Sequence, residues 1–367
     1  MIDSSSSPLL DLKGRVRRKF RRLIISAIGL DYGQNYFLDS FMGAARTDVE
    51  RVGLVSAARQ YNVPYNRGGW AEMGMSWPDR YIYALPDAIL EPTQNFVYDR
   101  NGRFIAESAA EGLYRLCLQG VDLEIRAPTR RVAGEWLHFG LSNNLYHGLL
   151  QDLPPFLAAA KAFPKLPILA RATNFKPALA ILKTFADRHI EWVNTPIRVE
   201  RLIMGAKTAG QGRPHTHSSV HPTDIELLRN WAKTHVCDGE DLPLSDVIYV
   251  SRSRARRGMK NEMELETALA SDGVHVFHGN MPFFDQIRTF RRARLVAGPS
   301  GAGLVNLVWM RPGGKVRMIA SGGFYAPFYV ELSSYMEHNF AWWNVTEDTW
   351  SDREIKLFRE HISEALV

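Results

Sequence analysis

The sequence has few cysteines and no long apolar run. Cys117 and Cys237 are its only cysteines, so a framework of several disulfides is excluded, and no C-x-x-C pair occurs. A membrane-spanning helix needs about 20 consecutive apolar residues, which no stretch of this chain supplies. These absences exclude a disulfide-stapled domain and predict a protein of a reducing compartment. We expect a cytoplasmic protein that meets the inner face of the plasma membrane only peripherally.

Several nucleotide-binding motifs are also missing. After Gly301-Ala-Gly303, the third glycine of a dinucleotide fingerprint is replaced by Asn306, and no acid follows at the expected distance. No G-K-[ST] follows either, which excludes a P-loop. D-x-D, which would hold a metal at a diphosphate, does not occur. We therefore expect no cofactor and no metal site, with a divalent cation left open.

Positive charge is in excess. The chain carries 45 lysines and arginines against 39 acids, a net charge of +6, which favours an anionic partner such as a nucleic acid, an anionic lipid or a phosphorylated small molecule. No helix-turn-helix, zinc finger or aromatic-basic RNA motif supports a nucleic-acid partner, so nucleic-acid binding is the weakest alternative and we expect no such partner.

Seven cations within residues 13–22 precede "LIISAIGL". They predict a helix on an anionic membrane surface or a solvated helix.

The second half alternates short apolar runs with helical patterns. Strands are expected at 246–252, 274–279, 294–298 and 315–320, with helices at 260–271, 283–293 and 301–310. This alternation is typical of a doubly wound parallel sheet. The first half gives fewer signals. We expect strands there at 135–140, 166–171 and 199–206, and helices at 177–189 and 223–236, the latter capped by Thr223.

The length of the chain and these patterns predict an α/β protein of two domains, the second a doubly wound parallel sheet. Its expected parts are a basic segment at 1–40, partly disordered or a membrane-surface helix, a first domain at 41–222, a second domain at 223–345, and a C-terminal helix at 346–367 that packs back on the first domain.

Ligands of open parallel sheets bind at the carboxyl ends of the strands, where three features of the second domain fall. The turn from Gly298 to Gly303 lies between a strand and a helix, where free amide groups can face a phosphate. The alternative to a phosphate site is that these glycines only allow the strand and the helix to pack tightly. Four arginines follow another strand, of which Arg252 and Arg257 are our candidates, with a solvated basic loop as the alternative. His278 and Gln286 could touch a base or ribose, or be structural.

In the first domain, "NNLYHGLLQD" gathers His147, Gln151 and Asp152. His147 and Gln151 are four residues apart, on one helical face. A histidine or a carboxylate beside a cleft commonly acts as a general base. The alternative is that these residues form only the polar side of an ordinary amphipathic helix.

Three histidines, His215, His217 and His221, fall in the polar stretch 207–222. Their spacing permits a zinc site, but Cys or acidic ligands are lacking nearby. A mobile substrate-contacting loop, or solvent exposure, is the preferred reading.

These motifs resemble glycosyltransferase family 61. That family shows N-x-x-H-W-x-x-D-x-L-P, then S-R with R-x-x-x-N-E, then a Gln-Ile, then G-x-H-G-A-G-L-x-N; here the corresponding segments are "NLYHGLLQDLPPF", "SRSRARRGMKNEMEL" and "DQIRTFRRARLVAGPSGAGLVN". The resemblance spans about 135–320. Ser300 stands where the family has histidine, and Gly148 where it has tryptophan.

The resemblance implies a GT-B fold of two Rossmann-like domains with doubly wound parallel sheets. It also implies inverting transfer of a sugar from a nucleotide-sugar donor to a polysaccharide or lipid-linked glycan, as in capsule synthesis. Asp152, which we prefer slightly, or His147 would deprotonate the acceptor. The donor would lie on the second domain, on a set of residues comprising Arg252, Arg257, Asn261, Glu262, His278, Gln286, Ser300, Gly301, Ala302, Gly303 and Asn306. A degenerate homologue that binds the donor without turnover is the alternative suggested by Ser300.

Overall fold

A computed structural model describes the fold. It describes residues 49–57, 59–66, 70–77, 79–93, 95–102, 105, 108, 128–207, 221–237, 246–255, 259–321, 328–345 and 349–364. The basic residues 13–22, the helix expected around them, the loop histidines His215 and His217, and Arg257 lie outside these ranges. Within them, no helix is long and apolar enough to cross a membrane.

The first half is built on a seven-stranded mixed sheet. Its strands are β1 (Glu50–Ser56), β4 (Arg80–Glu91), β5 (Phe96–Tyr98), β6 (Arg130–Phe139), β7 (Ile168–Arg171), β8 (Ile190–Val193) and β9 (Ile197–Gly205). They run in the order β1-β4-β9-β6-β7-β8, with β5 beside β4. Strands β9, β6, β7 and β8 are parallel, as expected, but β1, β4 and β5 pair antiparallel. The fully parallel sheet expected here is therefore wrong, because the Pro-, Tyr- and Trp-rich segment before residue 100 adds antiparallel strands.

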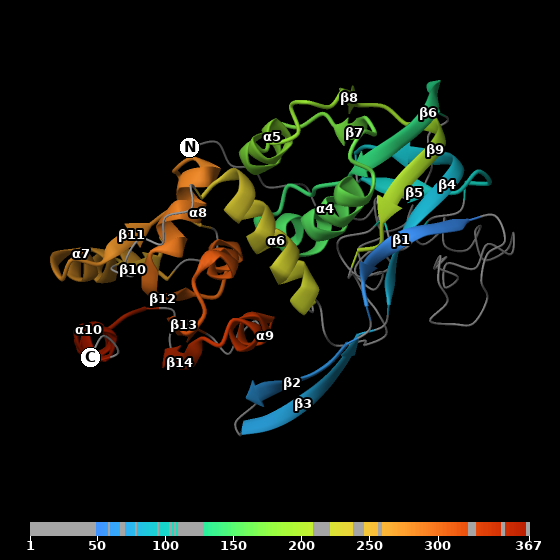
Figure 1. Cartoon of the computed structure of the whole chain (residues 1–367). Helices are drawn as coiled ribbons and strands as arrows, with labels where there is room; N and C mark the ends of the chain where they lie inside the picture. Colours follow the sequence, from blue (N-terminus) through green and yellow to red (C-terminus); the bar gives the residue numbers. More distant parts are fainter. Residues whose placement is uncertain are drawn as a thin grey trace, which may run out of the picture.

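Helices cover one face of this sheet. Helix α3 (Leu145–His147) runs through a π-helical turn (Gly148–Asp152) into α4 (Leu153–Ala162), whose residues from Leu153 to Ala160 are buried. Helix α5 (Lys176–Lys183) ends six residues before the predicted limit. A separate hairpin, β2 (Arg59–Asn66) with β3 (Trp70–Trp77), extends away from the sheet and contacts α9 of the second half (Figure 1).

The second half is the parallel sheet that the sequence predicts. Strands β10 (Asp246–Val250), β11 (His275–Phe277), β12 (Ala293–Pro299), β13 (Lys315–Ser321) and β14 (Asn339–Val345) run in the order β11-β10-β12-β13-β14, all parallel. The connections are α7 (Glu262–Ser271), α8 (Phe283–Arg291), the 3₁₀ helix η3 (Ala302–Trp309) and α9 (Phe328–Tyr335). The strand order reverses between β10 and β12, which is where such sheets bind ligands.

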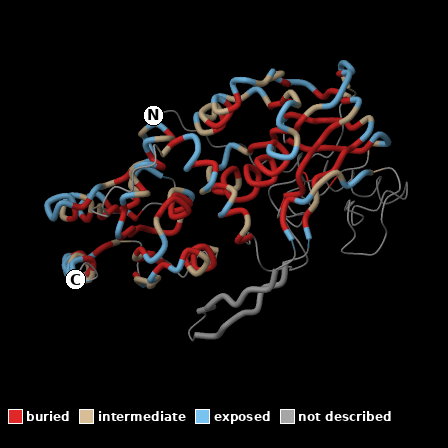
Figure 2. The backbone as a smooth tube through the Cα atoms, viewed as in Figure 1, coloured by how far each residue is buried: buried red, intermediate tan, exposed pale blue. Residues whose placement is uncertain are grey.

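Helix α6 (Pro222–His235) joins the two halves. It packs on α4 of the first half and on η3 of the second (Figure 1). One buried hydrophobic cluster runs through both, and Figure 2 shows the buried chain continuing across the joint. The sequence predicts Thr223 as the N-terminal cap of this helix, but the cap lies two residues earlier. Pro222 occupies the first turn, and His221 is the cap, its Nδ1 accepting from the Thr223 amide at 3.1 Å.

The C-terminal helix α10 (Asp352–Glu364) packs on the second half, which corrects the expected return to the first domain. Phe358 and Ile362 share a buried cluster with Tyr249 of β10 and Leu265 of α7. Arg359 also pairs with Asp272 at 2.6 Å. The apolar stripe of α10 therefore covers the sheet that it directly follows.

Candidate active site

The first-half motif lies on the π-helical turn. The Leu153 amide reaches back five residues to the Gly148 carbonyl, instead of the four of an α-helix. Pro154 and Pro155 come next and have no amide hydrogen to donate, so the wider turn forms where regular bonding is interrupted. Gly148 is buried, and a side chain there would come within 3.2 Å of the Ser142 carbonyl. Local π turns are frequent at functional sites.

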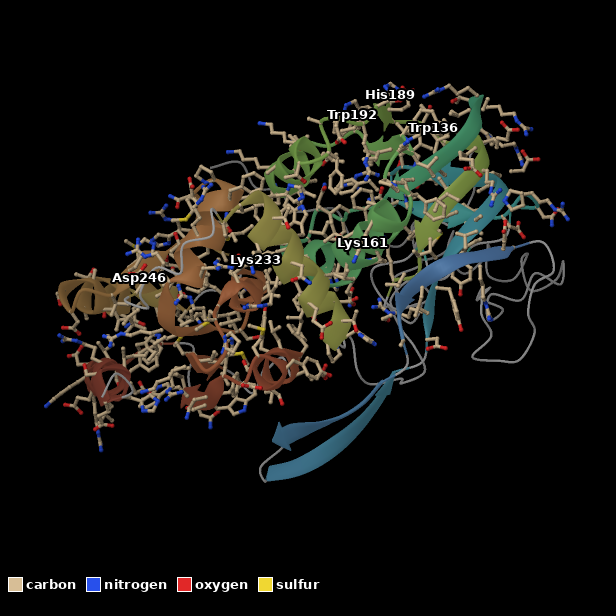
Figure 3. The ribbon with its side chains drawn as sticks, in the orientation of Figure 1. Trp136, Lys161, His189, Trp192, Lys233 and Asp246 are labelled. Atoms are coloured by element: carbon tan, nitrogen blue, oxygen red, sulfur yellow. The ribbon has the colours of Figure 1, made fainter. Side chains whose placement is uncertain are left out.

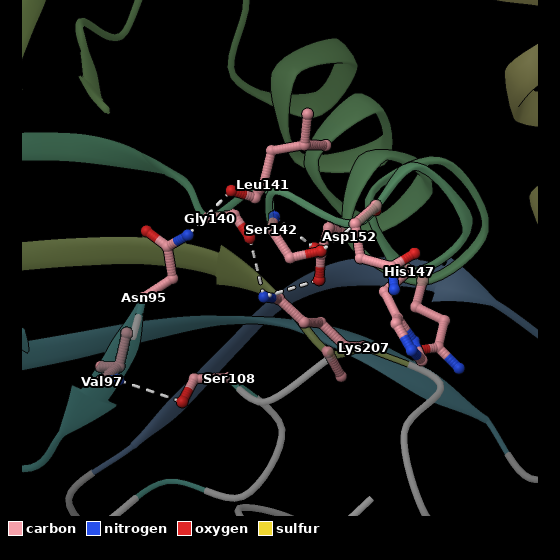
Figure 4. A network of polar contacts seen from close by, with 12 residues as sticks. Asn95, Val97, Ser108, Gly140, Leu141, Ser142, His147, Asp152 and Lys207 are labelled. Carbon is pink, nitrogen blue, oxygen red and sulfur yellow. Dashed lines mark hydrogen bonds and ion pairs between the residues drawn. The ribbon is translucent and has the colours of Figure 1, made fainter. Parts of the chain in front are cut away.

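Asp152 is held inside this turn by a buried ion pair. One carboxylate oxygen accepts from the Ser142 amide at 2.7 Å, and the other lies 2.8 Å from Lys207 Nζ (Figure 4). Lys207 also donates to the Gly140 carbonyl at 2.9 Å. Gly140 follows β6 and Lys207 follows β9, the two parallel strands at which the order of the first sheet reverses. Asp152 is therefore a charge-paired residue at this switch point, with 3 % of its surface exposed.

The environment of that ion pair disfavours further positive charge. His138, near the end of β6, is buried, and burial together with Lys207 lowers its pKa to about 3. His138 is therefore neutral at ordinary pH. Its Nε2 has no hydrogen-bond partner in the described part of the chain.

His147 is the more accessible of the two candidate bases. It is half-buried, and its Nδ1 lies 2.7 Å from Gln151 Oε1, as their spacing on one helical face predicts. A bond from Nδ1–H to that oxygen leaves Nε2 as the basic nitrogen. The glutamine thus fixes the ring without adding charge.

The glycine turn of the second half is shaped by close backbone approach. Gly298 has φ +157°, and a side chain there would meet the Val250 carbonyl at 2.5 Å. A side chain at Gly301 would lie 2.9 Å from three atoms of Arg252, and one at Gly303 would lie 2.8 Å from the Val250 side chain. The turn therefore packs against the end of β10, at the switch point of the second sheet.

The same turn presents amide groups at its surface. Gly301, Ala302 and Gly303 are partly or fully exposed, whereas Ser300 is buried. These three residues open η3, and the first amides of a helix have no acceptor within it. Ser300 itself is fixed through its backbone. Its amide donates to the Ile319 carbonyl at 3.2 Å, and its carbonyl accepts from Arg252 Nη1.

Glu262 positions Arg252. Its Oε1 accepts from the Arg252 amide at 2.7 Å and from the Tyr249 hydroxyl at 2.9 Å. Burial raises the pKa of Glu262, and these hydrogen bonds oppose that rise. Burial and this carboxylate also raise the pKa of Tyr249. Glu262, predicted to touch the donor, is 1 % exposed and instead anchors the loop that carries the arginine.

Three other predicted donor residues bond inside the protein. Asn261 uses its whole amide: Nδ2 donates to the Trp350 carbonyl at 2.7 Å and to Glu264 at 3.0 Å, and Oδ1 accepts from the Trp350 amide at 2.8 Å. Asn306 is fully buried between the Gly303 carbonyl and the Trp309 indole. Gln286 donates to the Met281 carbonyl at 3.0 Å. These groups hold the turn and the C-terminal segment, and their contact with a donor stays a prediction.

His278 remains near the ligand edge of the sheet. It follows β11, and its Nε2 lies 3.6 Å from Glu266. Glu266 in turn accepts from Ser251, which follows β10. His278 therefore contributes to a polar network at the carboxyl ends of β10 and β11, and its contact with a donor stays a prediction.

Aromatic side chains bring the two motifs together. The Tyr146 ring lies against Phe328 (centroids 4.3 Å apart) and edge-on to Tyr329 (6.1 Å), and it also meets the neighbouring His147 ring. The Tyr329 hydroxyl donates to the Gly301 carbonyl. Helix α3 accordingly contacts η3. The candidate base and the glycine turn thus lie beside one joint between the halves.

Sequence reasoning missed the residues that build this joint. Lys207 is the first residue of a polar stretch whose composition predicts a loop. Tyr146 and Tyr329 stand at positions where the sequence pattern predicts only ordinary apolar packing. The partners of these residues lie far away in the sequence, as in the pairs Asp152–Lys207 and Tyr146–Tyr329, and a local sequence pattern does not predict such pairs.

Two α/β halves bring a histidine, an arginine and a glycine turn to the joint between them. Residues 145–317 match the family model described as glycosyltransferase 61. This span runs from α3 into β13 and includes both motifs. Residues 145–317 therefore match a glycosyltransferase family 61 domain, which supports a glycosyltransferase enzyme. No curated protein matches it.

Proposed function

We propose that the protein transfers a sugar from a nucleotide-sugar donor to a polysaccharide or lipid-linked glycan, with inversion at the anomeric carbon. The two halves would act as the donor and acceptor domains of a GT-B enzyme. The observation that carries the proposal is the packing of α3 on η3, together with Tyr329 of α9, whose ring contacts Tyr146 and whose hydroxyl donates to the Gly301 carbonyl. It puts a candidate base of the first half next to a candidate anion site of the second.

The donor diphosphate is proposed to bind between Arg252 and the amides of Gly301, Ala302 and Gly303. Arg252 lies against Gly301, so one phosphate can meet both the guanidinium and the helix start. Guanidinium groups and helix N-termini stabilise the charge that develops on a leaving diphosphate. A divalent cation is not needed for this step as written, and metal independence stays a prediction.

We assign the role of general base to His147. The sequence slightly favoured Asp152, but that carboxylate is buried and paired with Lys207. His147 is half-buried, and Gln151 orients it. In the proposed step, Nε2 removes the acceptor hydroxyl proton as the oxygen attacks the anomeric carbon. The bond to the diphosphate breaks, and the nucleoside diphosphate leaves with the electron pair.

Ser300 replaces the histidine of the family pattern. Its burial and its two backbone bonds place it beneath the turn, where its backbone carbonyl holds Arg252. Loss of the histidine is therefore proposed to alter donor choice rather than to remove the arginine–amide site. Transfer measured with Ser300→His tests this: a change of preferred donor supports it, whereas activity that appears only in the variant would indicate a degenerate enzyme.

The proposal as a whole is tested by thermal unfolding and calorimetry of the full chain with nucleoside diphosphates and a panel of nucleotide sugars. A ligand of the native state at about 100 times its Kd adds about 2.7 kcal/mol to the free energy of unfolding and raises the Tm. We expect at least one nucleotide sugar to do so. Binding of none of them, in calorimetry as well as in melting, contradicts the proposal.

A further inference from the structure

A polar pocket lies in the first half, away from the glycine turn. It has a volume of about 450 Å³ and sits at the carboxyl ends of β7 and β8. Its lining comprises Pro92, Thr93, Asn143, Arg171, Ala172, Thr173, Asn174, Val193 and Asn194. Because parallel strands β6, β7 and β8 end here, the pocket is at the edge of the sheet where ligands bind in such folds.

Among the described residues that line this pocket, Arg171 alone is charged. Its guanidinium is fixed by two neutral partners: Nη1 donates to the Thr93 carbonyl at 3.2 Å and Nη2 to the Asn143 side chain. Thr173 donates to that same Asn143 oxygen at 3.2 Å. Among the described residues no carboxylate completes an ion pair with Arg171. A half-buried guanidinium that is held rigidly and lacks a counter-ion favours an anionic ligand.

More distant carboxylates act on Arg171 without pairing with it. Burial lowers the pKa of Arg171, and the carboxylates of Asp152 and Glu91 oppose this at a distance. Asp152 is already neutralised by Lys207. Arg171 nevertheless stays charged, since arginine does not deprotonate in proteins.

The rest of the lining is suited to hydroxyl groups. Side-chain amides and hydroxyls come from Thr93, Asn143, Thr173, Asn174 and Asn194, and the part of the lining that the structure describes adds no acid and no second cation. A planar guanidinium fork matches a single carboxylate, whereas phosphate sites commonly gather several donors of positive charge. Trp192, two residues before Asn194 on β8, is 44 % exposed, and Figure 3 shows it at the same outer edge as His189 and Trp136. An exposed indole offers an apolar face to a sugar ring.

We propose that this pocket is an acceptor subsite for an acidic sugar, whose carboxylate binds Arg171 and whose hydroxyls bind the surrounding asparagines and threonines. The inference rests on the proposed function, because it names the acceptor of that reaction. Asn143 connects the pocket to the catalytic helix. It precedes the Asn144 cap of α3 and is four residues from His147, at most about 14 Å along the chain. One glycan chain can thus reach both.

Binding of acidic and neutral oligosaccharides to the full chain tests the proposal without any donor. Oligogalacturonates and matching neutral oligosaccharides would be titrated by calorimetry and saturation-transfer NMR. We expect the acidic series to bind and Arg171→Gln to weaken it about 10- to 100-fold, the value of a charge-assisted hydrogen-bonded contact. Arg353→Gln, an exposed arginine on α10, is the matched control and should change nothing.

Loss of Arg171 also removes its bonds to Thr93 and Asn143, so a second variant separates binding from folding. Asn194 is exposed and lines the pocket. Asn194→Asp should weaken the acidic ligand and Asn194→Lys strengthen it, whereas the two substitutions should act alike on the neutral ligand and leave the Tm unchanged. Equal binding of acidic and neutral ligands, or insensitivity to both charges at 194, would overturn the proposal.

Two further measurements identify the ligand and distinguish the acceptor-subsite proposal from the transferase proposal. Tighter binding of sugar phosphates or inorganic phosphate than of galacturonate, with the same dependence on Arg171, would overturn the carboxylate assignment. Donor binding is measured on the same preparations with nucleotide sugars. If nucleotides bind and acidic glycans do not, the subsite fails while the transferase proposal stands; the reverse result would contradict the transferase proposal.

Discussion

The ring of Tyr146 lies edge-on against the ring of Tyr329, with centroids 6.1 Å apart and planes at 84°. Tyr146 precedes the candidate base in the first half, and Tyr329 bonds the glycine turn in the second. Both rings are buried, so the two motifs are held by packing and not by a mobile loop alone. The relative position of the candidate base and the glycine turn therefore depends on this pair.

Tyr329→Phe should loosen the glycine turn while keeping the ring contact. The lost hydrogen bond to the Gly301 carbonyl is expected to lower the free energy of unfolding by about 0.5–1.5 kcal/mol. Because the freed carbonyl belongs to the first residue of the proposed diphosphate site, donor affinity should fall severalfold as well. Urea unfolding and calorimetry with the best nucleotide sugar measure the two effects. Unchanged affinity would show that the bond does not shape the donor site.

His147→Gln should abolish most transfer without weakening donor binding. General base catalysis contributes about 10²- to 10⁴-fold, so kcat is expected to fall by that range. His189→Gln is the control, because that histidine is also on the first half but its side chain is 66 % exposed. A kcat for His147→Gln within a factor of two of the parent enzyme would exclude His147 as the base.

Asp152→Asn should destabilise the protein, since it leaves the Lys207 charge buried without its partner. Breaking a buried pair in this way costs about 3–5 kcal/mol. The control is Asp272→Asn, which removes the exposed pair with Arg359 and should cost less than about 1 kcal/mol. Adding Lys207→Met to Asp152→Asn should restore much of the loss. Full stability of Asp152→Asn together with lost activity would instead return the catalytic role to Asp152.

Arg252→Gln should weaken the binding of nucleoside diphosphates about 10-fold or more, the loss expected for a charge-assisted contact with phosphate. Arg254→Gln is a close control, because Arg254 is exposed and only two residues away. Calorimetry with the diphosphate alone isolates this contact from the sugar. Equal losses in the two variants would reduce the role of Arg252 to general positive charge.

Much of the second half could be predicted because its signals are local. Strands β10 to β13 and helices α7 and α8 follow from apolar runs and helical spacing, and the ligand edge follows from their parallel order. The roles of Glu262 and Asn261 could not be predicted, because a polar side chain near a strand end looks the same whether it faces a ligand or Tyr249 and Trp350. The direction of α10 was equally undetermined, since its apolar stripe fits either sheet.

Acid should destabilise the protein through its buried histidines. Burial lowers the pKa of His138 to about 3 and that of His338 to about 4, against an ordinary value of 6.5. The unfolded chain therefore binds more protons than the native one as the pH falls below 6.5, and the free energy of unfolding decreases until these folded values are reached. Each histidine contributes at most about 1.4 kcal/mol per pH unit to the change in the free energy of unfolding.

Urea unfolding from pH 7.5 to 4.5 measures the slope of the free energy of unfolding against pH. His138→Asn, which removes one titrating ring beside Lys207, should make it shallower by up to that amount. An unchanged slope would mean that His138 titrates alike in both states, which its burial beside a cation opposes.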